Sequence, residues 1–167
     1  MLELLSGGRL FQIGIVVPDL RKALERYSGA FGLGPWIGFH FTPDNVRDFT
    51  YRGRPADYSI EIALTVDPSP QVELVQVHGG GSLYHEWIER HGYGVQHLGV
   101  RVDDARAVAA EMTAAGYEIL QSGHGYGADG DGMFVYFDTL ADFGIITECI
   151  QVPASRRAPD FVWPPEP

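Results

Sequence analysis

Four polar side chains interrupt stretches of the sequence that are otherwise apolar. They are Gln12 in "FQIGIVVPDL" (11–20), Glu73 in "QVELVQV" (71–77), His97 in "VQHLGVRV" (95–102) and Glu148 in "GIITECIQV" (144–152). Burying an amide or a carboxylate is costly unless it is hydrogen-bonded, paired or bound to a metal ion. The four residue types offer three oxygen ligands, one nitrogen ligand and two negative charges, which together would neutralise a divalent ion. They are therefore candidate ligands of one divalent metal ion.

An internal repeat relates these four residues in pairs. The segment "QIGIVVPD" (12–19) aligns with "HLGVRVDD" (97–104), and "ELVQV" (73–77) aligns with "ECIQV" (148–152). Two matches in the same order favour a duplicated strand–helix–strands unit. The repeat makes Gln12 the counterpart of His97 and Glu73 the counterpart of Glu148, so we expect the four side chains to share one site. Taken singly, His97 is typical of a structural histidine and Glu73 of a solvent-facing strand residue.

The ligand chemistry favours an octahedral ion over a closed thiolate zinc site, with Zn²⁺, Co²⁺, Ni²⁺, Mn²⁺ and Mg²⁺ all compatible. Four protein ligands on such an ion leave two positions open. A substrate could occupy both positions through two of its oxygen atoms.

Hydrophobic periodicity and helix caps place the candidates on regular elements. Helices are expected from Asp19 to Gly32, from Ser82 to Arg90 and from Asp104 to Gly116. Strands are expected at 11–17, 35–41, 58–66, 71–77, 95–102, 117–121, 133–138 and 144–152. Residues 42–57 read as a long loop. The Pro-rich tail is expected to lack regular secondary structure, although it could pack extended against a neighbouring surface.

These elements predict an α+β fold of two tandem βαβββ modules. We expect a first module at 9–77, a linker helix at 78–94, a second module at 95–152 and the tail at 153–167, all within one domain. The sequence alone leaves open whether the metal site forms within one chain or between subunits.

Composition excludes several classes of partner. The 167-residue chain has a net charge of −10 and only one lysine, Lys22, so no basic stripe for nucleic acid or an anionic membrane is visible. Arg47, Arg52 and Arg54 form the one local basic cluster, which could meet a small anion or only keep a loop soluble. The single cysteine, Cys149, excludes an internal disulfide. With no signal peptide and no apolar run of about 20 residues, we expect a cytoplasmic protein.

The four quoted motifs resemble the vicinal oxygen chelate superfamily, also called the glyoxalase/bleomycin-resistance/dioxygenase fold. The resemblance covers about 9–152 and implies a half-barrel of paired modules. The second half, "QHLGVRVDD…GYEIL…FVYFDT…TECIQ", looks most like methylmalonyl-CoA epimerases. Those enzymes usually have His at the position of Gln12, and the set here instead resembles the Gln/Glu/His/Glu ligands of eukaryotic-type glyoxalase I.

The resemblance implies a divalent-metal-dependent isomerase, epimerase or lyase that abstracts a proton α to a carbonyl or thioester through a metal-chelated enediolate. Glu148 is the first candidate base, by its similarity to glyoxalase I. Glu61 in "YSIEIALTV" is the second, because it falls where the epimerases place a catalytic Glu. A solvent-facing Glu61 is the alternative. A homodimer is also implied.

Two other functions remain open. One is a non-catalytic drug-binding or resistance-type protein of the same fold, although such proteins usually lack a full ligand set. The other is a metal-assisted lyase or hydrolase of secondary metabolism, which would share the site and differ in substrate.

Overall fold

The computed structural model describes residues 9–67 and 70–165. The first half contains β1 (Arg9–Val16), α1 (Leu20–Phe31), β2 (Trp36–Phe41), β3 (Arg47–Tyr51), β4 (Arg54–Pro55), β5 (Ile60–Thr65), β6 (Gln71–Val77) and α2 (Leu83–His91). The second half contains β7 (Gly94–Arg101), α3 (Ala105–Ala114), β8 (Ile119–Tyr126), β9 (Gly132–Phe137), α4 (Leu140–Phe143), β10 (Ile146–Gln151) and β11 (Phe161–Trp163).

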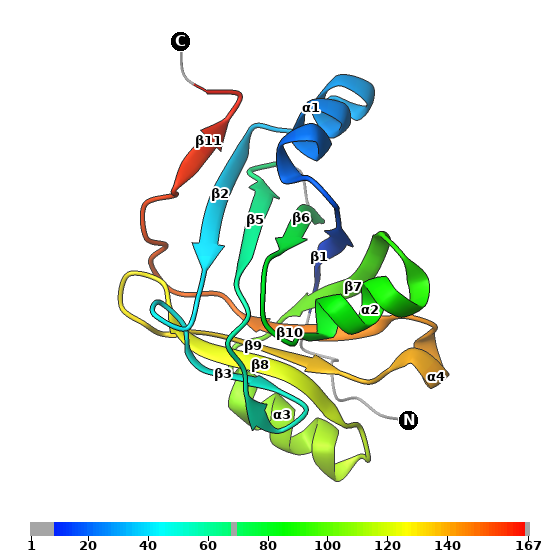
Figure 1. Cartoon of the computed structure of the whole chain (residues 1–167). Helices are drawn as coiled ribbons and strands as arrows, with labels where there is room; N and C mark the ends of the chain where they lie inside the picture. Colours follow the sequence, from blue (N-terminus) through cyan, green and yellow to red (C-terminus); the bar gives the residue numbers. More distant parts are fainter. Residues whose placement is uncertain (1–8, 68–69, 166–167) are drawn as a thin grey trace.

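All the strands join one mixed sheet that curls into a half-barrel (Figure 1). Its order is β11-β2-β5-β6-β1-β7-β10-β9-β8-β3-β4. In each half the first strand runs parallel to the last, β1 beside β6 and β7 beside β10. The two halves meet where β1 and β7 pair antiparallel. The predicted α+β fold of paired βαβββ modules is confirmed.

The helices that open the two halves are capped in the same way, as the repeat implies. Asp19 caps α1 and Asp104 caps α3 by accepting backbone N–H groups. The Gln76 side chain accepts the Leu20 N–H at 2.7 Å, and Gln151 accepts the Ala105 N–H at 3.1 Å. The glutamines of the two "QV" repeats thus hold the helix N-termini to the sheet. Each helix packs on the convex face of its own half, which leaves the concave face free for a site.

The prediction of a long loop at 42–57 was wrong. Part of this segment forms β3 and β4, and β3 pairs antiparallel with β8 of the other half. Phe49 is buried against the Tyr58 ring, and Thr50 Oγ1 lies 2.7 Å from Ser122 Oγ. This strand forms by pairing with a distant strand of the other half. Its sequence is largely polar, so a hydrophobic pattern does not reveal it.

The Pro-rich tail also forms a short strand, contrary to the expectation of no regular structure. β11 pairs antiparallel with β2, so the expected extended packing is found. Arg157 donates to both carboxylate oxygens of Asp160 at 2.7 Å, and Asp160 accepts the His40 N–H at 2.6 Å. These contacts fix the tail to the first half of the sheet.

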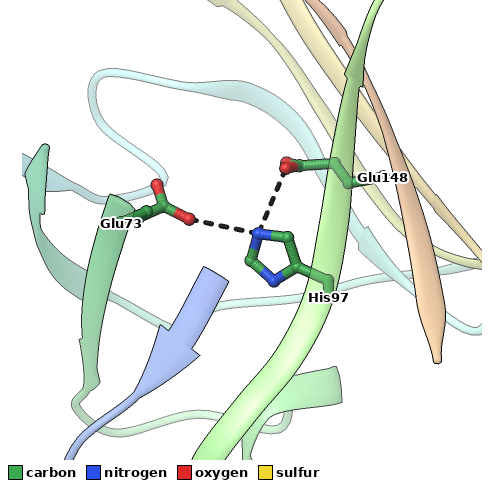
Figure 2. Close-up of side chains that lie close together, drawn as sticks. All are labelled: Glu73, His97 and Glu148. Carbon is green, nitrogen blue, oxygen red and sulfur yellow. Dashed lines mark ion pairs between the residues drawn. The ribbon is translucent and has the colours of Figure 1, made fainter. Parts of the chain in front are cut away.

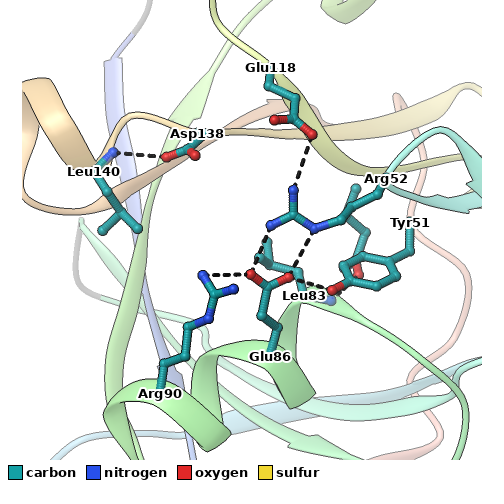
Figure 3. Close-up of polar contacts among 9 residues, drawn as sticks. Tyr51, Arg52, Leu83, Glu86, Arg90, Glu118, Asp138 and Leu140 are labelled. Atoms are coloured by element: carbon teal, nitrogen blue, oxygen red, sulfur yellow. Dashed lines mark hydrogen bonds and ion pairs between the residues drawn. The ribbon is translucent and has the colours of Figure 1, made fainter.

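A polar network joins the β3–β4 hairpin to α2 and to Glu118, the residue before β8 (Figure 3). Arg52 donates to Glu86 at 2.8 and 3.0 Å and to Glu118 at 3.1 Å, while the Tyr51 hydroxyl donates to Glu86. Arg52 holds the pKa of the Glu86 carboxyl below its usual value, with help from Tyr51 and Arg90. This member of the basic cluster therefore serves an internal ion-pair network.

Across residues 9–67 and 70–165, we find no helix with the length and apolar character needed to cross a bilayer.

Replacing Glu86 by Gln tests this network. The E86Q variant should lower the free energy of unfolding by about 1–2 kcal/mol at pH 7, as expected when a charged acceptor is lost. Because the folded-state pKa of Glu86 is lowered, its contribution is present above the unfolded-state value and is lost as pH falls through the folded-state value. The difference between wild type and E86Q in urea unfolding should therefore shrink in acid. Exposed Glu89 on the same helix is the control, and E89Q should change stability by less than about 0.5 kcal/mol.

Candidate metal centre

Side chains from β6, β7 and β10 converge on one point of the concave face. His97 Nε2 lies 3.3 Å from Glu73 Oε2 and 3.3 Å from Glu148 Oε2 (Figure 2). One ligand atom from each residue lies within 4.8 Å of the others, and all three side chains are buried. The structure brings these residues together within a single chain.

His97 is oriented by its neighbour Gln96. The Gln96 side-chain oxygen lies 2.6 Å from His97 Nδ1 and accepts its proton. Nε2 is then the atom that faces the two carboxylates, and it makes no hydrogen bond with any described residue. Burial disfavours the imidazolium, but contacts with Glu148 and Glu73 outweigh it and raise the pKa of His97 to about 9. The two carboxylates thus favour a positive charge at this point, either on a protonated imidazole or on a bound cation.

Burial also raises the pKa of Glu73, and the nearby Glu148 carboxylate acts in the same direction, while His97 opposes both. One Glu148 oxygen is buried without a hydrogen-bond partner among the described residues. Two carboxylates enclosed together are costly unless a charge of opposite sign joins them.

Gln12 lines the same pocket as Glu73 and Glu148 and is also buried. Its amide nitrogen donates a long hydrogen bond of 3.4 Å to the Gln71 side-chain oxygen, and Gln71 in turn donates to the Thr65 carbonyl at 2.8 Å. These bonds use the donor side of the Gln12 amide. Its oxygen is left as the atom available to a ligand in the pocket.

Two glycines make room for the candidate ligands at the β1–β7 seam. Gly14 pairs with His97 on one side and Glu73 on the other. A Cβ on Gly14 would lie 1.8 Å from the His97 ring. Gly99 pairs with Gln12 and with Glu148, and a Cβ there would lie 2.8 Å from the Gln12 Cβ.

The register also shifts immediately before each of these ligands. In β1, Phe11 lies between Leu10 and Gln12 and has no partner in β7. In β7, Gln96 likewise has no partner in β1, because Gly14 pairs with His97 and Ile15 pairs with Val95. A bulge sets two residues of one strand against one of its partner and re-aims side chains. Phe11 and Gln12 accordingly both line the pocket, although they are adjacent in a strand.

The pocket around the centre is predominantly apolar and aromatic. Its cavity volume is about 90 Å³, and its mouth is open to solvent. The Tyr84 and Tyr136 hydroxyls lie 2.8 Å apart in its wall, and burial raises the pKa of both phenols, so they remain protonated. The rest of its apolar lining includes Phe11, Phe39, Phe41, Ile60, Ile62, Leu64, Tyr126, Phe134, Ile150, Val152 and Pro153.

Glu61 is not brought to this pocket. Its neighbours Ile60 and Ile62 on β5 face the pocket, so alternation turns Glu61 to the other side of the sheet. There its half-exposed carboxylate lies 3.2 Å from His78 Nε2. The structure thus gathers four of the five candidate residues and leaves Glu61 apart from them.

The sequence reasoning missed several residues of this site. Gln96, Tyr84 and Tyr136 lie beside the candidate ligands, and Gln71 supports Gln12. The one available signal was that "VQHLG" places Gln96 next to a candidate ligand in an apolar strand. Regular alternation would turn Gln96 away from His97, and only the bulge brings both to one place.

Comparisons with known proteins give matches in both sequence and structure. An ethylmalonyl-CoA/methylmalonyl-CoA epimerase of Cereibacter sphaeroides is 27% identical over 117 residues, covering 70% of this chain and 77% of that protein. The methylmalonyl-CoA epimerase of Mycobacterium tuberculosis has a similar structure, with a TM-score of 0.62 and 22% identity over 86% of this chain and 88% of the other. A hypothetical protein of Bacillus halodurans gives a TM-score of 0.63 at 19% identity, covering 90% of this chain and 98% of that one.

The family model for the Glyoxalase/Bleomycin resistance protein/Dioxygenase superfamily matches residues 11–137. The match covers most of the chain and includes Gln12, Glu73 and His97, and the structure has the curled half-barrel typical of this fold. The chain therefore belongs to the glyoxalase/bleomycin resistance protein/dioxygenase superfamily.

Proposed function

We propose that this protein binds one divalent metal ion and catalyses proton transfer at a carbon next to a carbonyl or thioester. The observation that carries the proposal is the convergence of Glu73 and Glu148 on His97 Nε2, which has no hydrogen-bond partner among the described residues. This arrangement fits a cation, because two buried carboxylates and one imidazole nitrogen are ligands that transition-metal ions and Mg²⁺ accept.

The residues present fit a four-ligand centre. Glu73, His97 and Glu148 supply three ligand atoms within 4.8 Å of one another, and Gln12 supplies an amide oxygen from the adjacent part of the pocket. Gln96 supports His97 as the carboxylate or carbonyl partner of a metal-binding histidine commonly does. Zn²⁺, Co²⁺, Ni²⁺, Mn²⁺ and Mg²⁺ remain the candidate ions.

When bound, the ion would act as a Lewis acid and stabilise negative charge that develops on the substrate's carbonyl oxygen. Glu148 is the proposed base that removes the α-proton, since one of its oxygens has no hydrogen-bond partner among the described residues. Glu73 approaches His97 from the other half of the sheet (Figure 2) and is the proposed second acid–base group. Two such groups would let a proton leave one face of the carbon and return to the other. The aromatic walls would exclude water during the transfer.

The relatives support an isomerase of this kind. The matched proteins of C. sphaeroides and M. tuberculosis are described as epimerases of acyl-CoA thioesters. An epimerase acting on a carbonyl or thioester substrate is therefore the specific form of the proposal. A homodimer, which the family resemblance implies, remains a prediction.

Metal content and proton exchange test this function together. The purified protein should contain or take up about one divalent ion per chain, and the loaded protein should exchange an α-proton of some member of a panel of acyl thioesters and α-carbonyl acids with D₂O. H97A should lose the ion by elemental analysis. E148Q should slow exchange, followed by NMR, by at least about 100-fold, the scale of lost acid–base catalysis.

Glu61 provides the matched control, because it is a carboxylate on the same sheet but outside the pocket. E61Q should keep both metal and exchange. A chain that takes up no divalent ion when offered each of the five would contradict the proposal, and loss of exchange in E61Q but not E148Q would reverse the assignment of the base.

Gly14→Ala tests whether the glycine cradle holds the metal centre. A methyl group at this position would overlap the His97 ring, so G14A should weaken Zn²⁺ or Co²⁺ binding by at least about tenfold in a calorimetric titration. Gly29 lies in α1, and a Cβ there meets nothing within 4 Å. G29A should leave metal affinity unchanged and raise stability by about 0.5–1 kcal/mol. Equal metal affinities for wild type and G14A would contradict the role given to Gly14.

A non-catalytic binding protein is the second candidate, favoured by the aromatic lining of the pocket. It predicts tight binding of an aromatic compound such as an antibiotic in the presence of a chelator, with no proton exchange in any substrate tested. The metal-dependent enzyme predicts the opposite pair of results.

A further inference from the structure

The segment between β10 and β11 forms one wall of the pocket. Val152, Pro153, Arg156 and Arg157 all line it. Hydrogen bonds hold the segment in place: the Ala154 N–H donates to Asp131 at 2.9 Å, and the Ser155 carbonyl accepts the Ala128 N–H at 2.9 Å. This segment is therefore a fixed part of the pocket wall.

The two arginines of this wall differ in what they contact. The Arg157 side chain is held by contacts within the chain. It pairs with Asp160 at 2.7 Å, donates to the His40 carbonyl at 3.1 Å and lies over the Phe39 ring at 5.1 Å. Arg156 lines the same pocket but forms no ion pair with any carboxylate in the described part of the chain. Desolvation is the main cause that lowers the pKa of its guanidinium, and the nearby Arg101 contributes. Within residues 9–67 and 70–165, Arg156 thus has no carboxylate partner of the kind that Arg157 has in Asp160.

Arg156 and the candidate ligands Glu73 and Glu148 line the same pocket but differ in burial. The three candidate ligands are buried, whereas Arg156 is exposed, so it lies at the mouth. Apolar side chains such as Phe39, Ile62 and Phe134 line the same pocket. The chain carries a net charge of −10, so a cationic mouth is a local exception to a surface that otherwise repels anions.

We propose that the pocket takes an amphipathic substrate whose carbonyl end reaches the metal centre and whose anionic end, a carboxylate or a phosphate, pairs with Arg156. This inference rests on the proposed function and specifies its substrate class. A guanidinium at a partly dehydrated mouth pairs strongly with either kind of anion. The apolar body between the two ends would pack against the aromatic wall.

Two hydroxamic acids of matched length test the proposal on the Zn²⁺-loaded protein. Octanohydroxamic acid carries a chelating head and an apolar body, and 8-(hydroxyamino)-8-oxooctanoic acid adds a terminal carboxylate. In calorimetric titrations the wild type should bind the carboxylate probe about tenfold more tightly, the scale of one charge-assisted pair. R156Q should lose this preference while still binding octanohydroxamic acid, and R156K should restore part of it. R106Q removes one positive charge on α3, outside the pocket lining, and should keep the preference.

Propionyl-CoA distinguishes the two sources of the anion. If R156Q also weakens the binding of propionyl-CoA, the anionic end is the phosphate group of a thioester. If R156Q affects only the carboxylate probe, the anionic end is the carboxylate of a free acid. Either result supports a role for Arg156 in binding the anion.

Two further results would overturn the inference. One contradicts only the role of Arg156, and the other also contradicts the proposed metal function. If wild type and R156Q both bind octanohydroxamic acid in a metal-dependent way but show the same preference between the probes, the assignment of Arg156 fails alone. If the protein offered Zn²⁺ binds neither hydroxamic acid, the proposed metal function fails with it.

Discussion

The close approach of β1 and β7 is the constraint on which the rest of the site depends. Each strand carries a candidate ligand that crosses over a glycine of its partner, His97 over Gly14 and Gln12 over Gly99. The same glycines pair with Glu73 and Glu148 on their outer sides. Because the four side chains are related by the duplication, they meet at the seam between the halves. A side chain at either glycine would occupy the volume that the ligands need.

A second constraint is electrostatic. Burying Glu73 and Glu148 together separates two carboxylates from water, and the fold supplies only one imidazole between them. Gln96 holds that imidazole so that Nε2 faces both carboxylates. The rest of the lining is mainly apolar and aromatic, which strengthens any charge interaction inside the pocket. A positive charge at this point, on a protonated imidazole or a metal ion, therefore offsets part of the free-energy cost of burying the two carboxylates.

The parts of the pocket differ in whether they fall within the residues that the family model matches. The family match covers 11–137, which includes β1, β6 and β7, whereas the wall that carries Arg156 lies beyond it. The β3–β4 hairpin, which lies within the match, and β11, which lies after it, extend the sheet at its two ends. Gln12, Glu73 and His97 thus lie within the matched residues, whereas Glu148 and the wall that carries Arg156 both follow them.

The sequence by itself determined the duplicated fold and the residues gathered at the candidate centre. Helix caps such as Asp19 and Asp104 and the apolar strand patterns act through neighbouring residues, so short stretches reveal them. The tertiary structure alone decided the bulges beside Gln12 and His97, the side of β5 on which Glu61 lies, and the strand formed by 47–51. The physical reason is that these features depend on which distant strand is paired and in what register, and a shift of one residue turns a side chain to the opposite face. The exposed position of Arg156, which forms no ion pair within the described part of the chain, has the same origin, since the wall that presents it forms when the tail packs on the sheet.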